Sequence, residues 1–154
     1  MTDTRVTHGS ICALLFLIAG AALAESSLSV EEVIERRQRS YESLSDDLAK
    51  VAQLLKQGNA ETMAQIRPLT QSLVVTGAHL RDAFPPGSDQ GKTRARAAIW
   101  RNPDDFAQRL ARLNTALADL NRAAEAGSPD RTRAALQDAA GSCRACHFWY
   151  RALW

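Results

Sequence analysis

The chain has 154 residues, which lies in the usual range for one domain, so a single hydrophobic core is expected. Its 19 Lys and Arg residues nearly balance its 17 Asp and Glu residues, and the formal net charge is only +2. This balance differs from the strongly basic surface of a nucleic-acid-binding protein, so no nucleic-acid partner is expected.

The N-terminus has the pattern of an export signal. Arg5 precedes an apolar run that begins at Ile11, and small residues then lead to a cleavage point after Ala24. A membrane anchor is the alternative, but the run gives way to polar residues before it reaches the roughly 20 apolar residues of a spanning helix. We therefore predict that residues 1–24 are a signal peptide removed on export to the periplasm. Residues 25–154 are then the folded domain, without a membrane span.

Two amphipathic helices are predicted in the first half of this domain. Apolar residues recur at steps of three and four from Val30 to Leu55, with charged residues between them. A Gly-Asn pair stops this helix, and Asn59 can cap a second helix that runs to Phe84. Pro68 falls inside the second helix and should kink it.

Residues 85–102 are predicted to be a long connection, because Gly, Pro, Ser and basic residues replace the apolar periodicity. Few aromatic residues accompany its basic residues, so a solvated loop is a better interpretation than a nucleic-acid patch. These basic residues are Lys92, Arg94, Arg96 and Arg101.

Two further helices are predicted in the second half. Asn102 can cap a helix whose first turn contains a proline and acidic residues, and Gly127 ends that helix. Ser128 and Pro129 then begin the last helix. Its predicted apolar stripe consists of Leu136, Ala140, Cys143, His147 and Tyr150.

Four amphipathic helices without any strand can bury their apolar faces only against one another. Two of the three connections are short, which makes consecutive helices antiparallel. The predicted fold is therefore all-α, an antiparallel up-down-up-down four-helix bundle.

The chemistry of the chain is concentrated in one pentapeptide, Cys143-Arg144-Ala145-Cys146-His147. It has the spacing of a covalent c-type haem attachment site. On a helix, residues three and four positions apart lie on one side, so two thiols and one imidazole can reach the same group. The motif predicts one haem c, held by thioether links through Cys143 and Cys146, with iron ligated by His147.

Three other uses of these cysteines were considered. A zinc site needs four ligands, and the only other histidine of the domain, His79, is expected at the surface of another helix. A thioredoxin-like pair lies at a helix N-terminus after a strand, whereas this pair is near a helix C-terminus. A structural disulfide would leave the adjoining His147 unexplained.

Several short segments occur in an order shared with a known family. They are Arg37-Gln38 with Tyr41 three residues on, Phe84-Pro85-Pro86-Gly87-Ser88-Asp89, Ile99-Trp100, Phe106, and the attachment motif closing in Tyr150-Arg151. In these segments, and over nearly the whole domain from Val33 to Arg151, the chain resembles cytochrome c′, the four-helix class of c-type cytochromes.

The resemblance implies a role for each matching residue. His147 would be the single protein ligand of the iron, and Arg151 would flank the same, proximal face of the haem. Arg37, next to Gln38, would lie near a haem propionate, although a solvated ion pair is an alternative for it. Tyr41 would cover the vacant sixth coordination position, and it can also be a core aromatic residue with a hydrogen-bonded hydroxyl.

The resemblance also implies a function, namely five-coordinate high-spin iron that binds nitric oxide or carbon monoxide, with or without electron transfer. The alternative is a low-spin, six-coordinate electron carrier whose sixth ligand is Met63 or another residue, although a core position suits Met63 better. An enzyme is not expected, because no acid-base pair is placed beside the distal face. The expected partners are a second copy in a homodimer, small gases and a redox protein.

The C-terminal residues depart from the family pattern, because apolar side chains follow the haem ligand. An exposed aromatic cluster there would form a contact surface toward a second subunit, a redox partner or the membrane, unless it folds back on the bundle. The residues concerned are Phe148, Trp149, Leu153 and Trp154.

Overall fold

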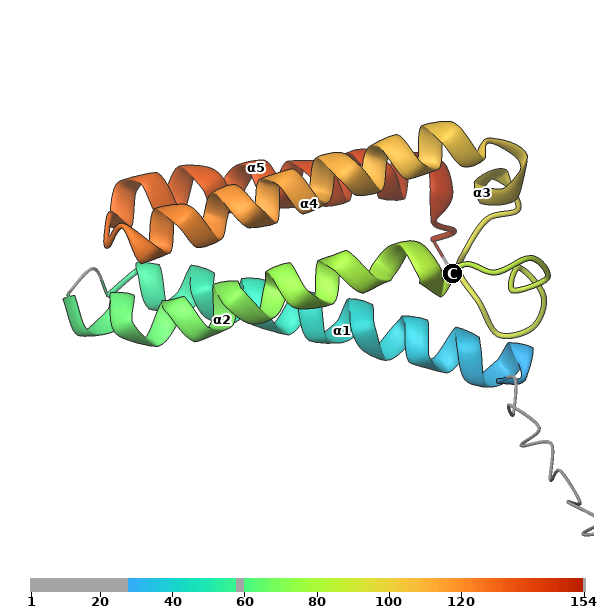
Figure 1. The fold of residues 1–154 in the computed structure, drawn as a ribbon, viewed down its shortest axis with the longest axis horizontal. Coiled ribbons are helices and arrows are strands. Elements are labelled where there is room, and N and C mark those ends of the chain that lie inside the picture. The colour runs from blue at the N-terminus through green and yellow to red at the C-terminus, as the bar shows by residue number, and fades with distance from the viewer. Residues whose placement is uncertain (1–27, 58–59, 154) are drawn as a thin grey trace, which may run out of the picture.

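The computed structural model describes residues 28–57 and 60–153, and 80% of these residues are helical (Figure 1). The predicted signal peptide, the capping role of Asn59 and the contact role of Trp154 lie outside this part of the chain. The elements are α1 (Val30–Leu55), α2 (Ala60–His79), the 3-10 helix η1 (Leu80–Ala83), α3 (Ala98–Arg101), α4 (Pro103–Glu125) and α5 (Pro129–Tyr150).

The four long helices form the predicted up-down-up-down bundle. In Figure 1, α1 and α2 lie side by side as one layer, and α4 and α5 form the other. The packing is most extensive between α4 and α5, and it continues from α1 to α2 and from α2 to α4. In contrast, α1 and α5 touch each other only lightly. Among the described helices, none combines the length and apolarity that a membrane-spanning segment needs.

The apolar core has two parts. The larger cluster fills the bundle toward α3 and includes Phe106, Leu117 and Tyr150. The smaller cluster lies near the α1–α2 connection, where Met63 packs with Leu55 and their neighbours. Met63 is thus a buried core residue, as the sequence favoured. The surface interpretation of His79 is also confirmed, since its side chain is exposed.

The second helix ends earlier than predicted. It was expected to continue to Phe84, but α2 ends at His79 and tightens into η1 up to Ala83. Two prolines follow Phe84, and a residue before proline avoids the α conformation, so the helix cannot pass through this point. Pro68 lies inside α2 without ending it.

Two further differences concern the connection between α2 and α4. This connection was predicted to be irregular, but it contains the helical turn α3. Asn102 was predicted to cap α4, yet its side chain makes no capping hydrogen bond. The Asn102 side-chain nitrogen instead donates to the carbonyl of Ala98 over 3.1 Å. The amide nitrogen therefore satisfies a carbonyl of α3, while the amide oxygen makes no hydrogen bond to the first turn of α4.

The buried stripe of α5 is rotated from the predicted one. Gly127, with φ of +66°, ends α4 as expected. The buried residues of α5 are Thr132, Ala139, Cys146 and Tyr150, whereas Cys143 and His147 are only half-buried. The reason is that α5 packs mainly against α4, and this contact determines which of its residues are buried.

Candidate haem-binding site

A cavity of about 510 Å³ lies between α1 and α5, which pack against each other only lightly. The loop after η1 closes one end of it. Six of the seven predicted site residues contribute to its wall: Arg37, Gln38, Tyr41, Cys146, His147 and Arg151. The seventh, Cys143, is half-buried one turn earlier on α5 and packs against the larger core cluster.

The two cysteines are free thiols held in apolar surroundings. Burial raises the pKa of the Cys143 thiol, and it raises the pKa of the Cys146 thiol to about 11. Both groups are therefore protonated at neutral pH, unlike the low-pKa thiolate of a redox-active pair. The structure thus contradicts the disulfide alternative and gives no support to the thioredoxin-like one.

His147 is half-buried in the cavity wall. Burial is the main cause that lowers the pKa of its imidazole, and the positive charges of Arg151 and Arg94 lower the pKa further. The neutral imidazole is the form that coordinates a metal, so this environment suits an iron ligand.

Arg37 is buried, with only 4% of its surface exposed. Its guanidinium donates to Ser88 Oγ (2.9 Å), the Ser88 carbonyl (2.8 Å), Thr93 Oγ1 (2.7 Å) and the Ala83 carbonyl (3.2 Å). It also lies 4.6 Å from the ring centre of Phe84. The solvated ion-pair interpretation is therefore wrong.

The charge of Arg37 has no counterpart in the described part of the chain, where it forms no ion pair with a carboxylate. Burial lowers the pKa of its guanidinium, which reflects the cost of keeping a cation away from water. An anionic group in the adjoining cavity would offset this cost. A haem propionate has that charge, so the residues present fit a haem.

The residues that accept hydrogen bonds from Arg37 also determine the conformation of the loop after η1. Ser88 is fully buried, and its hydroxyl donates to the Pro85 carbonyl over 2.9 Å. Trp100 Nε1 donates to the same carbonyl over 3.1 Å, and Gln38 Nε2 donates to the Lys92 carbonyl over 2.9 Å. The sequence analysis did not predict that Ser88 accepts hydrogen bonds from Arg37. The only signal was that residues 84–89 belong to a segment shared with the family.

Replacing Arg37 with alanine is expected to lower the free energy of unfolding by about 2–4 kcal/mol, because several charge-assisted hydrogen bonds are lost at a buried site. Chemical denaturation of the haem-loaded protein measures this change. Arg36→Ala is the matched control, since Arg36 is exposed on the same turn and its loss should change the free energy by less than about 0.5 kcal/mol. Equal effects of the two substitutions would contradict the anchoring role of Arg37.

Tyr41 lies on the α1 side of the cavity. Its ring centre is 6.5 Å from that of His147 and 6.3 Å from that of Phe84. Burial is the main cause that raises the pKa of its hydroxyl, so the group stays protonated. Tyr41 packs against the larger core cluster, as expected of a core aromatic residue, but its hydroxyl has no hydrogen-bond partner among the described residues. Tyr41 thus retains a free donor beside the cavity.

The basic side chains of the connection at residues 85–102 are exposed, as expected for a solvated loop, but its backbone is hydrogen-bonded to the C-terminal segment. Arg96 N donates to the Tyr150 carbonyl (3.0 Å), and Ala152 N donates to the Arg94 carbonyl (2.8 Å). The Arg94 guanidinium also donates to the carbonyls of Ala152 (3.2 Å) and Leu153 (2.5 Å). The loop is therefore bonded to the chain directly after the predicted iron ligand, a contact that the local sequence pattern could not indicate.

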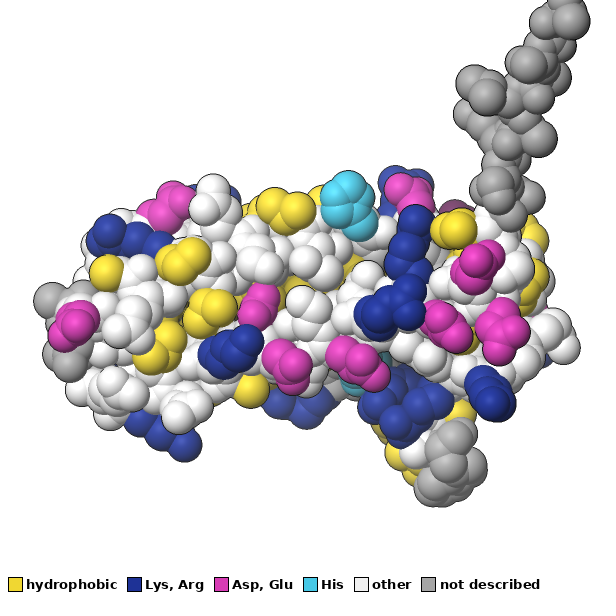
Figure 2. Space-filling view, turned by 90° about the horizontal axis from the view of Figure 1, so that it is seen from below, with side chains coloured by type: hydrophobic (Ala, Val, Ile, Leu, Met, Phe, Trp, Pro, Cys, Tyr) yellow, Lys and Arg dark blue, Asp and Glu magenta, His cyan; other side chains and the backbone are white. Residues whose placement is uncertain are grey.

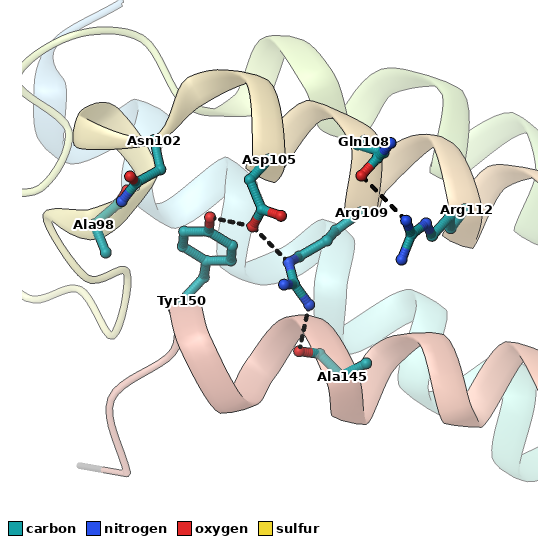
Figure 3. A network of polar contacts seen from close by, with 8 residues as sticks. All are labelled: Ala98, Asn102, Asp105, Gln108, Arg109, Arg112, Ala145 and Tyr150. Atoms are coloured by element: carbon teal, nitrogen blue, oxygen red, sulfur yellow. Dashed lines mark hydrogen bonds and ion pairs between the residues drawn. The ribbon is translucent and has the colours of Figure 1, made fainter.

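A polar network joins α4 to the attachment motif (Figure 3). Asp105 accepts hydrogen bonds from the Tyr150 hydroxyl (2.5 Å) and from Arg109 Nε (2.7 Å). Arg109 also donates to the carbonyl of Ala145, inside the motif, over 3.2 Å. The bond from Arg109, and then that from Tyr150, lowers the pKa of the Asp105 carboxyl. The network fixes the haem-binding end of α5 against α4.

A helical bundle with this attachment motif at the end of its last helix defines a four-helix c-type cytochrome. The family model "Cytochrome C′" matches residues 32–151. The chain belongs to the cytochrome c′ family, whose members bind haem c.

Individual relatives agree with this assignment. The cytochrome c′ of Alcaligenes xylosoxydans xylosoxydans is 31% identical over 121 residues, which cover 79% of this chain and 94% of the relative. A solved cytochrome c′ described as having ligand-controlled dimer dissociation is 27% identical, with a TM-score of 0.77 over 82% of this chain and 99% of that one. A nitric oxide complex of a cytochrome c′ variant from Alcaligenes xylosoxidans is 30% identical, with a TM-score of 0.74 over 80% and 97%.

Proposed function

We propose that this chain is an exported haem protein that binds small diatomic gases, nitric oxide or carbon monoxide. Cys143 and Cys146 would hold one haem c through thioether links, and Arg37 would offset the charge of a propionate. Haem iron with His147 as its single protein ligand supplies an open coordination position for the gas.

The proposal rests mainly on Tyr41, the residue that α1 contributes to the cavity wall opposite α5. Tyr41 lines the cavity with His147, and a protonated phenol is a poor iron ligand beside a histidine. Its free hydroxyl can donate a hydrogen bond to a bound gas. Met63, the alternative sixth ligand, packs in the smaller core cluster, which includes neither Tyr41 nor the attachment cysteines. This position argues against the low-spin electron carrier.

The relatives support the same proposal. One solved relative is a nitric oxide complex, and another is described by its ligand-controlled dimer dissociation. We therefore extend gas binding and a homodimer to this chain as proposals. We also propose that residues 1–24 direct the protein to the periplasm and are removed there.

A binding role fits the cavity better than catalysis. Glu42 is the only carboxylate among the residues that line the cavity, and His147 is the only histidine. An acid-base pair beside the distal face would be needed for peroxide or nitrogen-oxide chemistry. We propose a carrier or binding protein and no enzymatic activity.

Absorption and electron paramagnetic resonance spectra of the purified ferric and ferrous protein test the proposed function. We expect a high-spin, five-coordinate spectrum that changes on addition of nitric oxide or carbon monoxide. The intact mass of the same sample should correspond to residues 25–154 plus one haem. A low-spin, six-coordinate spectrum that is indifferent to both gases would overturn the gas-binding proposal in favour of electron transfer.

A further inference from the structure

An apolar patch lies on the surface directly after the predicted iron ligand. Phe148, Trp149 and Leu153 are 71%, 55% and 69% exposed. The rings of Phe148 and Trp149 meet edge to face, with 5.1 Å between their centres. These three residues, the C-terminal patch, do not fold back onto the bundle. Exposed aromatic pairs of this kind commonly contribute most of the energy of a protein interface.

Positive charge accompanies the C-terminal patch. Four exposed arginines flank it in sequence or bond to it, and none of them forms an ion pair within the described residues: Arg94, Arg96, Arg144 and Arg151. Arg94 and Arg96 donate to backbone carbonyls of Leu153 and Phe148, and neither forms an ion pair with a carboxylate of the described residues. In Figure 2, Lys and Arg side chains lie toward the end of the bundle where Figure 1 places the C-terminal end, with Asp and Glu side chains among them.

We propose that the C-terminal patch docks an acidic electron-donor protein, which reduces the haem through this end of α5. The partner's reduced centre would give up one electron and the ferric iron would gain it, with no bond made or broken. Charge complementarity identifies an acidic partner, because the arginine rim attracts negative charge and steers association. The patch begins at the residue after His147, so docking there brings the donor close to the iron ligand.

Two other occupants fit the patch less well. In a symmetric homodimer the same surface would face itself, so the four exposed arginines of one copy would repel those of the other. An anionic membrane would attract the arginines, but three apolar side chains are a small area beside the long apolar face of a membrane-binding helix. An acidic protein surface complements the charge of the arginines and is large enough to cover the three apolar side chains.

The test compares the haem-loaded protein with its Phe148→Ser/Trp149→Ser variant, using an acidic plant-type ferredoxin as the probe donor. Stopped-flow absorbance measures the second-order rate of haem reduction, and calorimetry measures binding of the oxidised ferredoxin. We expect the native rate to fall as salt is added and the variant rate to be about tenfold lower at low salt. Arg144→Gln should lower the rate and weaken its salt dependence.

Val75→Ser is the matched control, since Val75 is also an exposed apolar residue but lies on α2. Its rate and affinity should equal those of the native protein. A small uncharged hydroquinone should reduce the haem at the same rate in all variants. Gas binding should also be retained in all of them, so that a failure of this proposal can be told apart from a failure of the proposed function. Unchanged ferredoxin rate and affinity in the double variant would overturn it. The proposal would also be overturned if the double variant lost its homodimer, or its binding to phosphatidylglycerol vesicles, while its rate and affinity with ferredoxin stayed the same.

Discussion

Replacing both Cys143 and Cys146 with alanine is expected to abolish covalent haem attachment, from one haem per chain to none. The two thiols are the only ones in the predicted mature chain, so no other residue can form the thioether links. Haem staining of a denaturing gel, together with intact mass, measures the covalently bound haem directly.

Arg144→Gln is the control for this experiment, because Arg144 lies between the two cysteines and its side chain is exposed. It should keep the full amount of attached haem. Each single cysteine variant should retain at most one thioether link. Haem that remains on the double variant through denaturation would show that attachment does not use these residues.

The helices of the bundle could be predicted from the sequence because their signal is local. Apolar residues at steps of three and four, with Gly127 and the proline-containing first turns, determine helix positions within a few residues. The attachment motif is equally local, since Cys143, Cys146 and His147 lie within five residues of one helix. The family match added Arg37, Gln38 and Tyr41, and the structure brings all three to the cavity wall.

The contacts that shape the site could not be predicted in this way, because they join distant segments. Arg37 reaches Ser88, 51 residues away, and Arg94 reaches Leu153, 59 residues away. Apolar periodicity describes one helix at a time. It contains no information about which loop atoms accept hydrogen bonds from a helix side chain. The same limit explains why Asn102 stands at the start of α4 as predicted but makes no side-chain capping bond, and its amide nitrogen bonds to the neighbouring turn α3 instead.

The α5 stripe shows how packing decides what periodicity leaves open. A period of 3.6 residues allows either Ala139 and Cys146 or Ala140 and Cys143 to face the core. The dominant contact with α4 selects the former. His147 lies in the cavity wall together with the buried Cys146, so both can reach a ligand there.

Replacing Tyr41 with methionine is expected to convert most of the iron from high-spin to low-spin. A thioether is a good sixth ligand for haem, and the side chain would enter the cavity from the same position on α1. Electron paramagnetic resonance and visible spectra of the ferric protein measure the spin state. Carbon monoxide binding to the ferrous variant should also slow, because the gas must displace the methionine.

Tyr41→Phe is the matched control, because it keeps the ring and removes only the hydroxyl. The spin state should stay high, and the free energy of unfolding should change by less than about 0.5 kcal/mol, since this hydroxyl has no partner in the described residues. Loss of the donor should instead weaken the hydrogen bond to a bound gas, which shifts its stretching frequency in the infrared spectrum. A methionine variant that stays high-spin would place Tyr41 away from the sixth position, and the distal residue would then have to be sought elsewhere along α1.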